Sequence, residues 1–302
     1  MMPLRIEPLP RMAGHLPFMR GRLGSLDDLN PGMVGAFGLA SGCDSRTDLA
    51  ALAMRETSAY FGSHFNANMK SAMDIDQRRA LNSAAMAGAI VDLGDLMTDP
   101  ATGGFDAVIR RTVAGICERG ALPLMLGGEQ WDVAPAIAGL RSTAIASAGM
   151  AVLVICAAPD EFVLEARDVH CLVSASPRSM ANSACLPIAF RDVRQRFEGS
   201  LGSILGHLGT RPVHVALDAS ALASHWHGTN RRADFDGLSL SECRTLLRKL
   251  GAANIASLSI TGLDPTINGL SLVKTGQRLL LTAILDLIYA RLNVLGPRME
   301  RI

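Results

Sequence analysis

Two histidines, His225 and His227, have a spacing that suggests metal binding. In an extended segment a His-x-His pair places both imidazoles on the same side, where they can bind a transition metal. Asp218 and Asp160 lie earlier in the chain, and with either carboxylate the pair would form a single-metal centre. A solvated or interface loop is the plainer interpretation of the same residues, and both interpretations remain open.

Cys156 is a second residue type with chemical potential. It follows an apolar run, where it would serve either as a soft metal ligand or nucleophile, or as a small apolar packing residue. Asp160 and Asp218 also have two interpretations. Each carboxylate is either a metal ligand or a structural group at a strand end, tied by hydrogen bonds to a loop or to a nearby arginine. The elements that carry these residues therefore decide what they can do together.

Three apolar runs lead into the candidate residues. Residues 151–155 form an unbroken run with three β-branched side chains, typical of a strand buried on both faces of a parallel sheet. Residues 122–126 run into Gly127-Gly128-Glu129-Gln130, and residues 213–217 end at Asp218. Ligands bind at the carboxyl ends of the strands in open α/β sheets, so we expect the residues after these runs to share one edge.

Short apolar runs alternate with helical patterns along the rest of the chain. This alternation predicts a three-layer α/β/α sandwich with a mostly parallel central sheet. Residues 1–30 are predicted to form an N-terminal arm, and residues 31–302 a single domain. Further strands are predicted at residues 33–39, 87–93, 169–173, 186–190 and 254–260, and helices at residues 48–61, 104–120, 132–140, 239–250 and 277–292.

Composition narrows the function classes. The net charge is +1 and charged residues make up 19% of the 302, so nothing in the charge favours binding to nucleic acid or to an anionic membrane. No apolar run approaches the roughly 20 residues that span a bilayer. The six cysteines lie far apart, which favours reduced thiols and a cytoplasmic protein.

Three segments, taken in order, resemble the signatures of the ureohydrolase family, which includes arginases and agmatinases. Gly127-Gly128-Glu129-Gln130 resembles the motif G-G-x-H, residues 156–160 resemble D-A-H-x-D, and residues 216–220 resemble S-x-D-x-D. Residues 91–95 and 237–250 give supporting matches, and the resemblance covers about residues 33–292. It implies an arginase-like fold. In that family, two divalent cations activate a water that attacks a guanidinium carbon.

The resemblance also implies that this chain has lost most of the metal ligands. Two carboxylates without imidazoles cannot hold a close pair of cations, so we expect no metal and no catalysis in this chain. The family's ligand positions correspond to Gln130, Cys156, Ala158, Asp160, Asp218 and Ser220, of which only Asp160 and Asp218 keep the ligand type, and the acid that faces the guanidinium corresponds to Gly262.

A degenerate chain of this kind resembles the inactive subunits of bacterial metformin and guanidine hydrolases. The resemblance implies a non-catalytic subunit in a trimer- or hexamer-based hetero-oligomer, beside a homologous catalytic subunit that binds two nickel or manganese ions. The complex would hydrolyse a guanidine or biguanide compound, such as metformin, to urea or a substituted urea plus an amine. Two alternatives remain: a standalone ligand-binding or regulatory protein, and a hydrolase with a rebuilt single-metal site of Asp218, His225 and His227.

Overall fold

The computed structural model describes residues 17–40, 49–63, 72–74, 79–81, 89–97, 104–160, 163, 169–175, 183–223, 237–263, 281, 284, 287 and 288. Structural statements below refer to these residues. The segment with His225 and His227 lies outside them, so the predicted His-x-His site stays a prediction.

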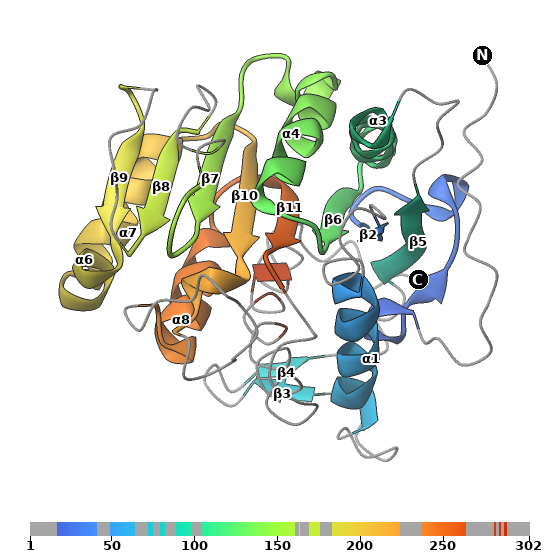
Figure 1. The fold of residues 1–302 in the computed structure, drawn as a ribbon, viewed down its shortest axis with the longest axis horizontal. Helices are drawn as coiled ribbons and strands as arrows, with labels where there is room; N and C mark the ends of the chain where they lie inside the picture. The colour runs from blue at the N-terminus through green and yellow to red at the C-terminus, as the bar shows by residue number, and fades with distance from the viewer. Residues whose placement is uncertain are drawn as a thin grey trace.

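A parallel sheet forms the centre of the molecule (Figure 1). Within the described residues it has nine strands in the order β1-β5-β2-β6-β11-β10-β7-β8-β9, and every neighbouring pair is parallel. The strands are β1 (Arg22–Leu23), β2 (Val34–Ala40), β5 (Ile90–Met97), β6 (Leu122–Leu126), β7 (Ala151–Ile155), β8 (Cys171–Ser174), β9 (Leu186–Ala189), β10 (Val213–Asp218) and β11 (Ile255–Thr261). A separate antiparallel pair consists of β3 (Ala72–Asp74) and β4 (Arg79–Leu81).

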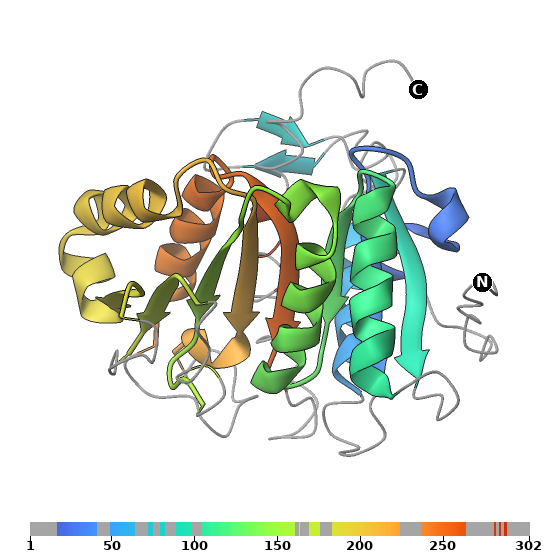
Figure 2. The same cartoon turned by 90° about the horizontal axis from the view of Figure 1, so that it is seen from above.

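Helices cover both faces of this sheet and bury one apolar cluster on each face (Figure 2). One face carries α1 (Ala50–Ser63), α6 (Phe190–Gln195), α7 (Phe197–Leu208) and α8 (Leu240–Leu250), and the other carries α3 (Phe105–Glu118) and α4 (Val133–Arg141). Successive side chains of a strand point to opposite faces, so the fully apolar runs of β6 and β7 are buried on both sides. The predicted three-layer α/β/α sandwich is therefore confirmed.

The predicted elements match the structure with shifts of a few residues. The strand predicted at residues 87–93 is β5 and continues to Met97. Four residues of the last predicted helix, Leu281, Ile284, Leu287 and Ile288, are helical and buried, and the rest of it lies outside the described residues. None of the described helices is long and apolar enough to cross a membrane.

Part of the predicted N-terminal arm lies against the sheet. Phe18 is completely buried in the core on the α1 face, and β1 pairs with β5 as the first strand of the sheet. The described part of residues 1–30 thus contributes to the core and to the sheet, whereas the division of the chain into an arm and one domain stays a prediction.

An ion pair between Arg55 and two aspartates fixes α1 to β5. Arg55 Nε lies 2.7 Å from Asp92 Oδ2, its Nη2 donates to Asp92 Oδ1 at 2.9 Å, and its Nη1 pairs with Asp95. Asp92 Oδ2 also accepts the backbone N–H of Phe18, at 2.7 Å. Burial opposes the charged form of the guanidinium, but hydrogen bonds and attraction from the two carboxylates raise the pKa of Arg55 above its ordinary value.

Candidate functional site

Four neighbouring strands bring the sequence-predicted site residues to one edge of the sheet. These strands are β6, β11, β10 and β7, in that spatial order. Asp218 pairs in register with Thr261 on β11, and the residue before Asp218 pairs with the last residue of β7. Gln130, Gly262 and Cys156 follow the other three strand ends, so this edge is where the family's site would lie.

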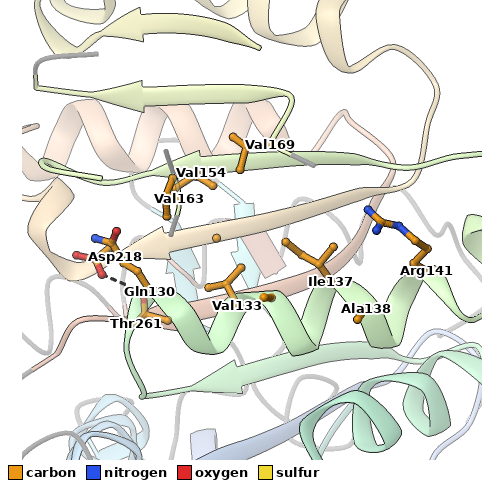
Figure 3. A pocket seen from close by; sticks show the side chains of 12 residues that line it. Gln130, Val133, Ile137, Ala138, Arg141, Val154, Val163, Val169, Asp218 and Thr261 are labelled. Carbon is orange, nitrogen blue, oxygen red and sulfur yellow. Dashed lines mark hydrogen bonds between the residues drawn. The ribbon is translucent and has the colours of Figure 1, made fainter. Parts of the chain in front are cut away.

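Asp218 is the buried carboxylate at the centre of this edge. Its side chain is 4% exposed. Oδ1 accepts the backbone N–H of Ser220 at 2.9 Å and the Ser220 hydroxyl at 2.5 Å. Oδ2 accepts the hydroxyl of Thr261 at 3.0 Å, drawn in Figure 3. Both oxygens of this carboxylate are therefore hydrogen-bonded to neutral donors.

Ser220 connects the ends of β10 and β7. Its hydroxyl donates to Asp218 and accepts the backbone N–H of Ala157 at 3.1 Å, and the side chain is completely buried. An aspartate here, as the family motif has, would place a second negative charge directly beside Asp218. Like charges at this separation oppose each other strongly unless cations lie between them.

Gln130 ties the loop after β6 to the loop after β7. Its Nε2 donates to the carbonyl of Ala158 at 3.2 Å, and its Oε1 accepts the backbone N–H of Asp160 at 3.0 Å. Since β11 and β10 lie between β6 and β7, the Gln130 side chain links loops from two strands that are not neighbours. A carboxamide supplies both the donor and the acceptor for this link. Gln130 thus has a structural role at a position where the family has a histidine ligand.

The remaining candidates in the loop after β7 are also engaged in structure. Asp160 Oδ1 accepts the backbone N–H of Val163 at 2.8 Å, while its Oδ2 is a buried oxygen without a hydrogen-bond partner. Cys156 is completely buried within the apolar cluster on the α4 face, which favours its interpretation as a packing residue over that of a nucleophile. Ala158 is exposed and contributes only its carbonyl to the link with Gln130.

Gly262 leaves no room for the acidic side chain that the family would have there. Its φ is +70°, a conformation that glycine adopts at little cost. A Cβ at this position would lie 2.7 Å from the carboxyl carbon of Asp218. An acid at residue 262 is therefore incompatible with the present position of Asp218.

The donors at this edge do not fit a pair of divalent cations. Of the six ligand positions only two are carboxylates: Asp218 accepts three hydrogen bonds from Ser220 and Thr261, and Asp160 directs one oxygen to the backbone and has the other, Oδ2, without a hydrogen-bond partner among the described residues. Across the described part of the chain, no three His, Cys, Asp or Glu residues come together as a potential metal site. The single-metal alternative also needs His225 and His227, which lie outside the described residues.

Sequence reasoning missed two polar features of β10 and β11. Thr261 holds Asp218, and only its place immediately before Gly262 pointed to it. His214 is completely buried, with Nδ1 2.6 Å from the Ser257 hydroxyl and Nε2 3.2 Å from that of Ser259. Burial lowers the pKa of His214 to about 3, so its imidazole is neutral. The sequence signal that could have found Thr261 and His214 is the presence of polar residues inside otherwise apolar runs.

A cavity of about 70 Å³ lies beside these groups, between α4 and the sheet (Figure 3). Gln130, Asp218 and Thr261 form its polar end, and Arg141 lies at the other end. The walls between them are apolar. The arrangement can therefore accommodate a small ligand but contains no activated nucleophile or metal ligand set among the residues that line it.

Several solved structures resemble this one over nearly the whole chain. A hypothetical agmatinase from Burkholderia thailandensis has a TM-score of 0.69 and 17% sequence identity, covering 94% of this chain and 93% of its own. The agmatine ureohydrolase of Thermoplasma volcanium has a TM-score of 0.68 and 14% identity, covering 95% and 97%. Proclavaminate amidino hydrolase from Streptomyces clavuligerus has a TM-score of 0.69 and 16% identity, covering 94% and 99%.

The sequence matches no model of a known protein family and no curated protein. At identities of 14–17% the structural similarity establishes the fold, which is the arginase-like α/β fold of these neighbours.

Proposed function

We propose that this chain is a ureohydrolase-family protein without its own metal site, and that it acts as the non-catalytic subunit of a heteromeric hydrolase. The complex would hydrolyse a guanidine or biguanide compound, such as metformin, to urea or a substituted urea plus an amine. Similarity to agmatinases and to an amidino hydrolase over more than nine tenths of the chain supports the family.

The hydrogen bonding of Asp218 is the observation that carries the proposal. The carboxylate of a metal-binding aspartate points at the cation, whereas Asp218 accepts three hydrogen bonds from Ser220 and Thr261, with a donor on each of its oxygens. The Gln130 link supports the same conclusion, because its carboxamide uses donor and acceptor on backbone groups. In this proposal, these hydrogen bonds hold the strand ends together without cations.

In this proposal the chemistry belongs to a homologous partner subunit. That subunit would bind two nickel or manganese ions, and this chain would stabilise it in a trimer- or hexamer-based assembly. A reducing compartment such as the cytoplasm suits the buried thiols of the described residues, since none of them forms a disulfide: Cys117, Cys156, Cys171, Cys185 and Cys243.

Co-expression with a homologous subunit that keeps G-G-x-H, D-A-H-x-D and S-x-D-x-D tests the proposal. We expect the two chains to elute together in size-exclusion chromatography with light scattering, and to release urea faster than either chain alone. Elemental analysis should find about two metal ions per partner subunit and none per copy of this chain. Failure of the chains to associate, or full activity of the partner alone, would refute the subunit role.

A matched complex locates the chemistry. It combines this chain with a partner whose D-A-H-x-D histidine is replaced by alanine, and we expect it to assemble without releasing urea. Urea release from this complex, or stoichiometric metal in the isolated chain, would favour the rebuilt site of Asp218, His225 and His227. A ligand bound by the chain alone, without any partner, would favour the standalone regulatory protein.

A further inference from the structure

The helix α4 separates two hollows that share residues. One is the cavity between α4 and the sheet, and the other is a groove of about 360 Å³ between α4 and α3. Ala138 and Arg141 line both, so both hollows reach the C-terminal half of α4. Neither Ala138 nor Arg141 takes part in the strand-end hydrogen bonds described above.

The cavity under α4 has apolar walls and two ends of different charge. Val133 and Ile137 of α4 face Val154 of the sheet across it (Figure 3), and Ala216 also lines it. Its volume of about 70 Å³ suits a short aliphatic group of a few carbon atoms, since a single water needs only about 10–15 Å³ on the same measure. The carboxylate of Asp218 at the inner end would repel an anion, and the guanidinium of Arg141 at the outer end would attract one.

The groove beside it is lined by three arginines. Arg110 and Arg111 come from α3 and Arg141 from α4, and among the described residues no carboxylate lines the groove. Gly139 allows the two helices to approach closely, since a Cβ there would lie 2.9 Å from the Cβ of Val113. A hollow lined by charges of one sign raises the local concentration of counter-ions.

Three guanidinium groups line the groove near the C-terminal end of α4. The C-terminus of α4 carries a partial negative charge, and one arginine in its last turn, Arg141, compensates it. Arg110 and Arg111 supply further positive charge to the same groove. Guanidinium groups recognise carboxylates through paired hydrogen bonds, so this end of α4 is suited to hold one.

We propose that the two hollows form one binding site for a short, branched aliphatic carboxylate. The carboxylate would lie on Arg141 with Arg110 beside it, and the apolar tail would enter the cavity under α4. The tail is uncharged, because the walls between the two ends are apolar. At its inner end the site shares Gln130 and Asp218 with the strand-end ligand positions, but it does not depend on the proposed role in a heteromer.

Titration of the full chain with 3-methylbutanoate, followed by ligand-observed NMR, tests the site. We expect millimolar binding, with acetate at least tenfold weaker, since each buried methylene contributes about fourfold in affinity. Octanoate should bind no more than twofold more tightly than 3-methylbutanoate, because the cavity is short. Binding of 3-methylbutylammonium or 5-aminopentanoate as strong as that of 3-methylbutanoate would overturn the assignment, as would equal binding of acetate.

Variants at the two ends of the site complete the test. Arg141→Gln should weaken 3-methylbutanoate binding at least tenfold, whereas Arg191→Gln, an exposed arginine on α6, should leave it unchanged. Ala134→Leu narrows the cavity from α4 and should abolish the difference between 3-methylbutanoate and acetate. If Ala134→Leu does not fold, Arg110→Gln supplies the second measurement, with an expected loss of about threefold. Unchanged binding in Arg141→Gln would refute the proposal.

Discussion

At β5, Asp92 and Asp95 face the buried guanidinium of Arg55, whereas at β10 Asp218 accepts hydrogen bonds from the hydroxyl and amide donors of Ser220 and Thr261. Both regions bury carboxylates in the same parallel sheet. In the first, the chain supplies the compensating positive charge itself. In the second, the chain supplies hydrogen-bond donors that carry no net charge. The difference shows that this sheet holds buried carboxylates in two ways: with a guanidinium at β5, and with hydrogen bonds from hydroxyl and amide groups at the central edge.

Removal of the positive charge at β5 should have the largest effect. Arg55→Met leaves Asp92 and Asp95 buried without their counter-charge, and we expect a loss of about 3–5 kcal/mol in the free energy of unfolding. Urea denaturation measures it. Arg119→Met is the matched control, because Arg119 pairs with the largely exposed Asp27 and should cost less than about 1 kcal/mol. Equal losses in the two variants would contradict the comparison.

An acid restored at residue 262 should be the next most costly change. Gly262→Asp places a side chain at φ +70° against the carboxyl group of Asp218, and we expect a loss of about 3 kcal/mol. Gly149→Asp is the control: Gly149 also has a positive φ, but a Cβ there meets nothing within 4 Å. It should cost about 1 kcal/mol, from backbone strain alone. A Gly262→Asp protein as stable as the control would show that Asp218 moves freely.

Lowering the pH should reduce the free energy of unfolding through His214. The pKa of His214 falls from its usual 6.5 to about 3 in the folded chain, because the imidazole is buried. The unfolded chain therefore binds more protons below pH 6.5, and stability falls as the pH drops from 6.5 towards 3. At pH 5 this amounts to about 2 kcal/mol, at roughly 1.4 kcal/mol per pH unit.

Denaturation curves at pH 5 and 7 for the wild type and His214→Gln measure this contribution. The variant should lose the pH-dependent part, and His207→Gln, a half-buried histidine on α7, should keep it. An unchanged pH dependence in His214→Gln would mean that the imidazole is not buried in a neutral form.

The Gln130 link should give the smallest of these effects. Gln130→Ala removes two hydrogen bonds to the loop after β7, and we expect a loss of about 1–2 kcal/mol. Hydrogen exchange of the Asp160 amide should accelerate, since Gln130 accepts its N–H. Gln195→Ala, at an exposed position on α6, should change stability by less than about 0.5 kcal/mol and leave that amide unaffected.

The sequence predicted the sheet and its central strands because their side chains are apolar on both faces. It failed where no such pattern exists. The two residues of β1 show no periodicity, and the helix α7 contains Gly199, Gly202 and Gly206, which weaken a helical pattern. The spatial order of the strands was also out of reach, because chain order does not place β11 between β6 and β10.

The sequence predicted where the residues of the candidate site lie, but not the hydrogen bonds that they form. The resemblance located Gln130, Asp218, Ser220 and Gly262 at strand ends, and the structure brings those ends together. The sequence did not predict the hydrogen bonds from Gln130 to the loop after β7, or the bond from Thr261 to Asp218. These bonds depend on the strand order and on loop geometry, and a sequence pattern contains neither the order nor the geometry.

The close approach of Gly262 to Asp218 has a bearing on evolutionary history. On the proposed descent from an active enzyme, regaining the acid at residue 262 first requires the Asp218 carboxyl to turn away. It cannot turn while Ser220 and Thr261 hold both of its oxygens. On this descent, an acid at residue 262 is therefore harmful by itself and becomes tolerable only after other substitutions release Asp218. The order in which substitutions arise then decides whether that acid can be regained.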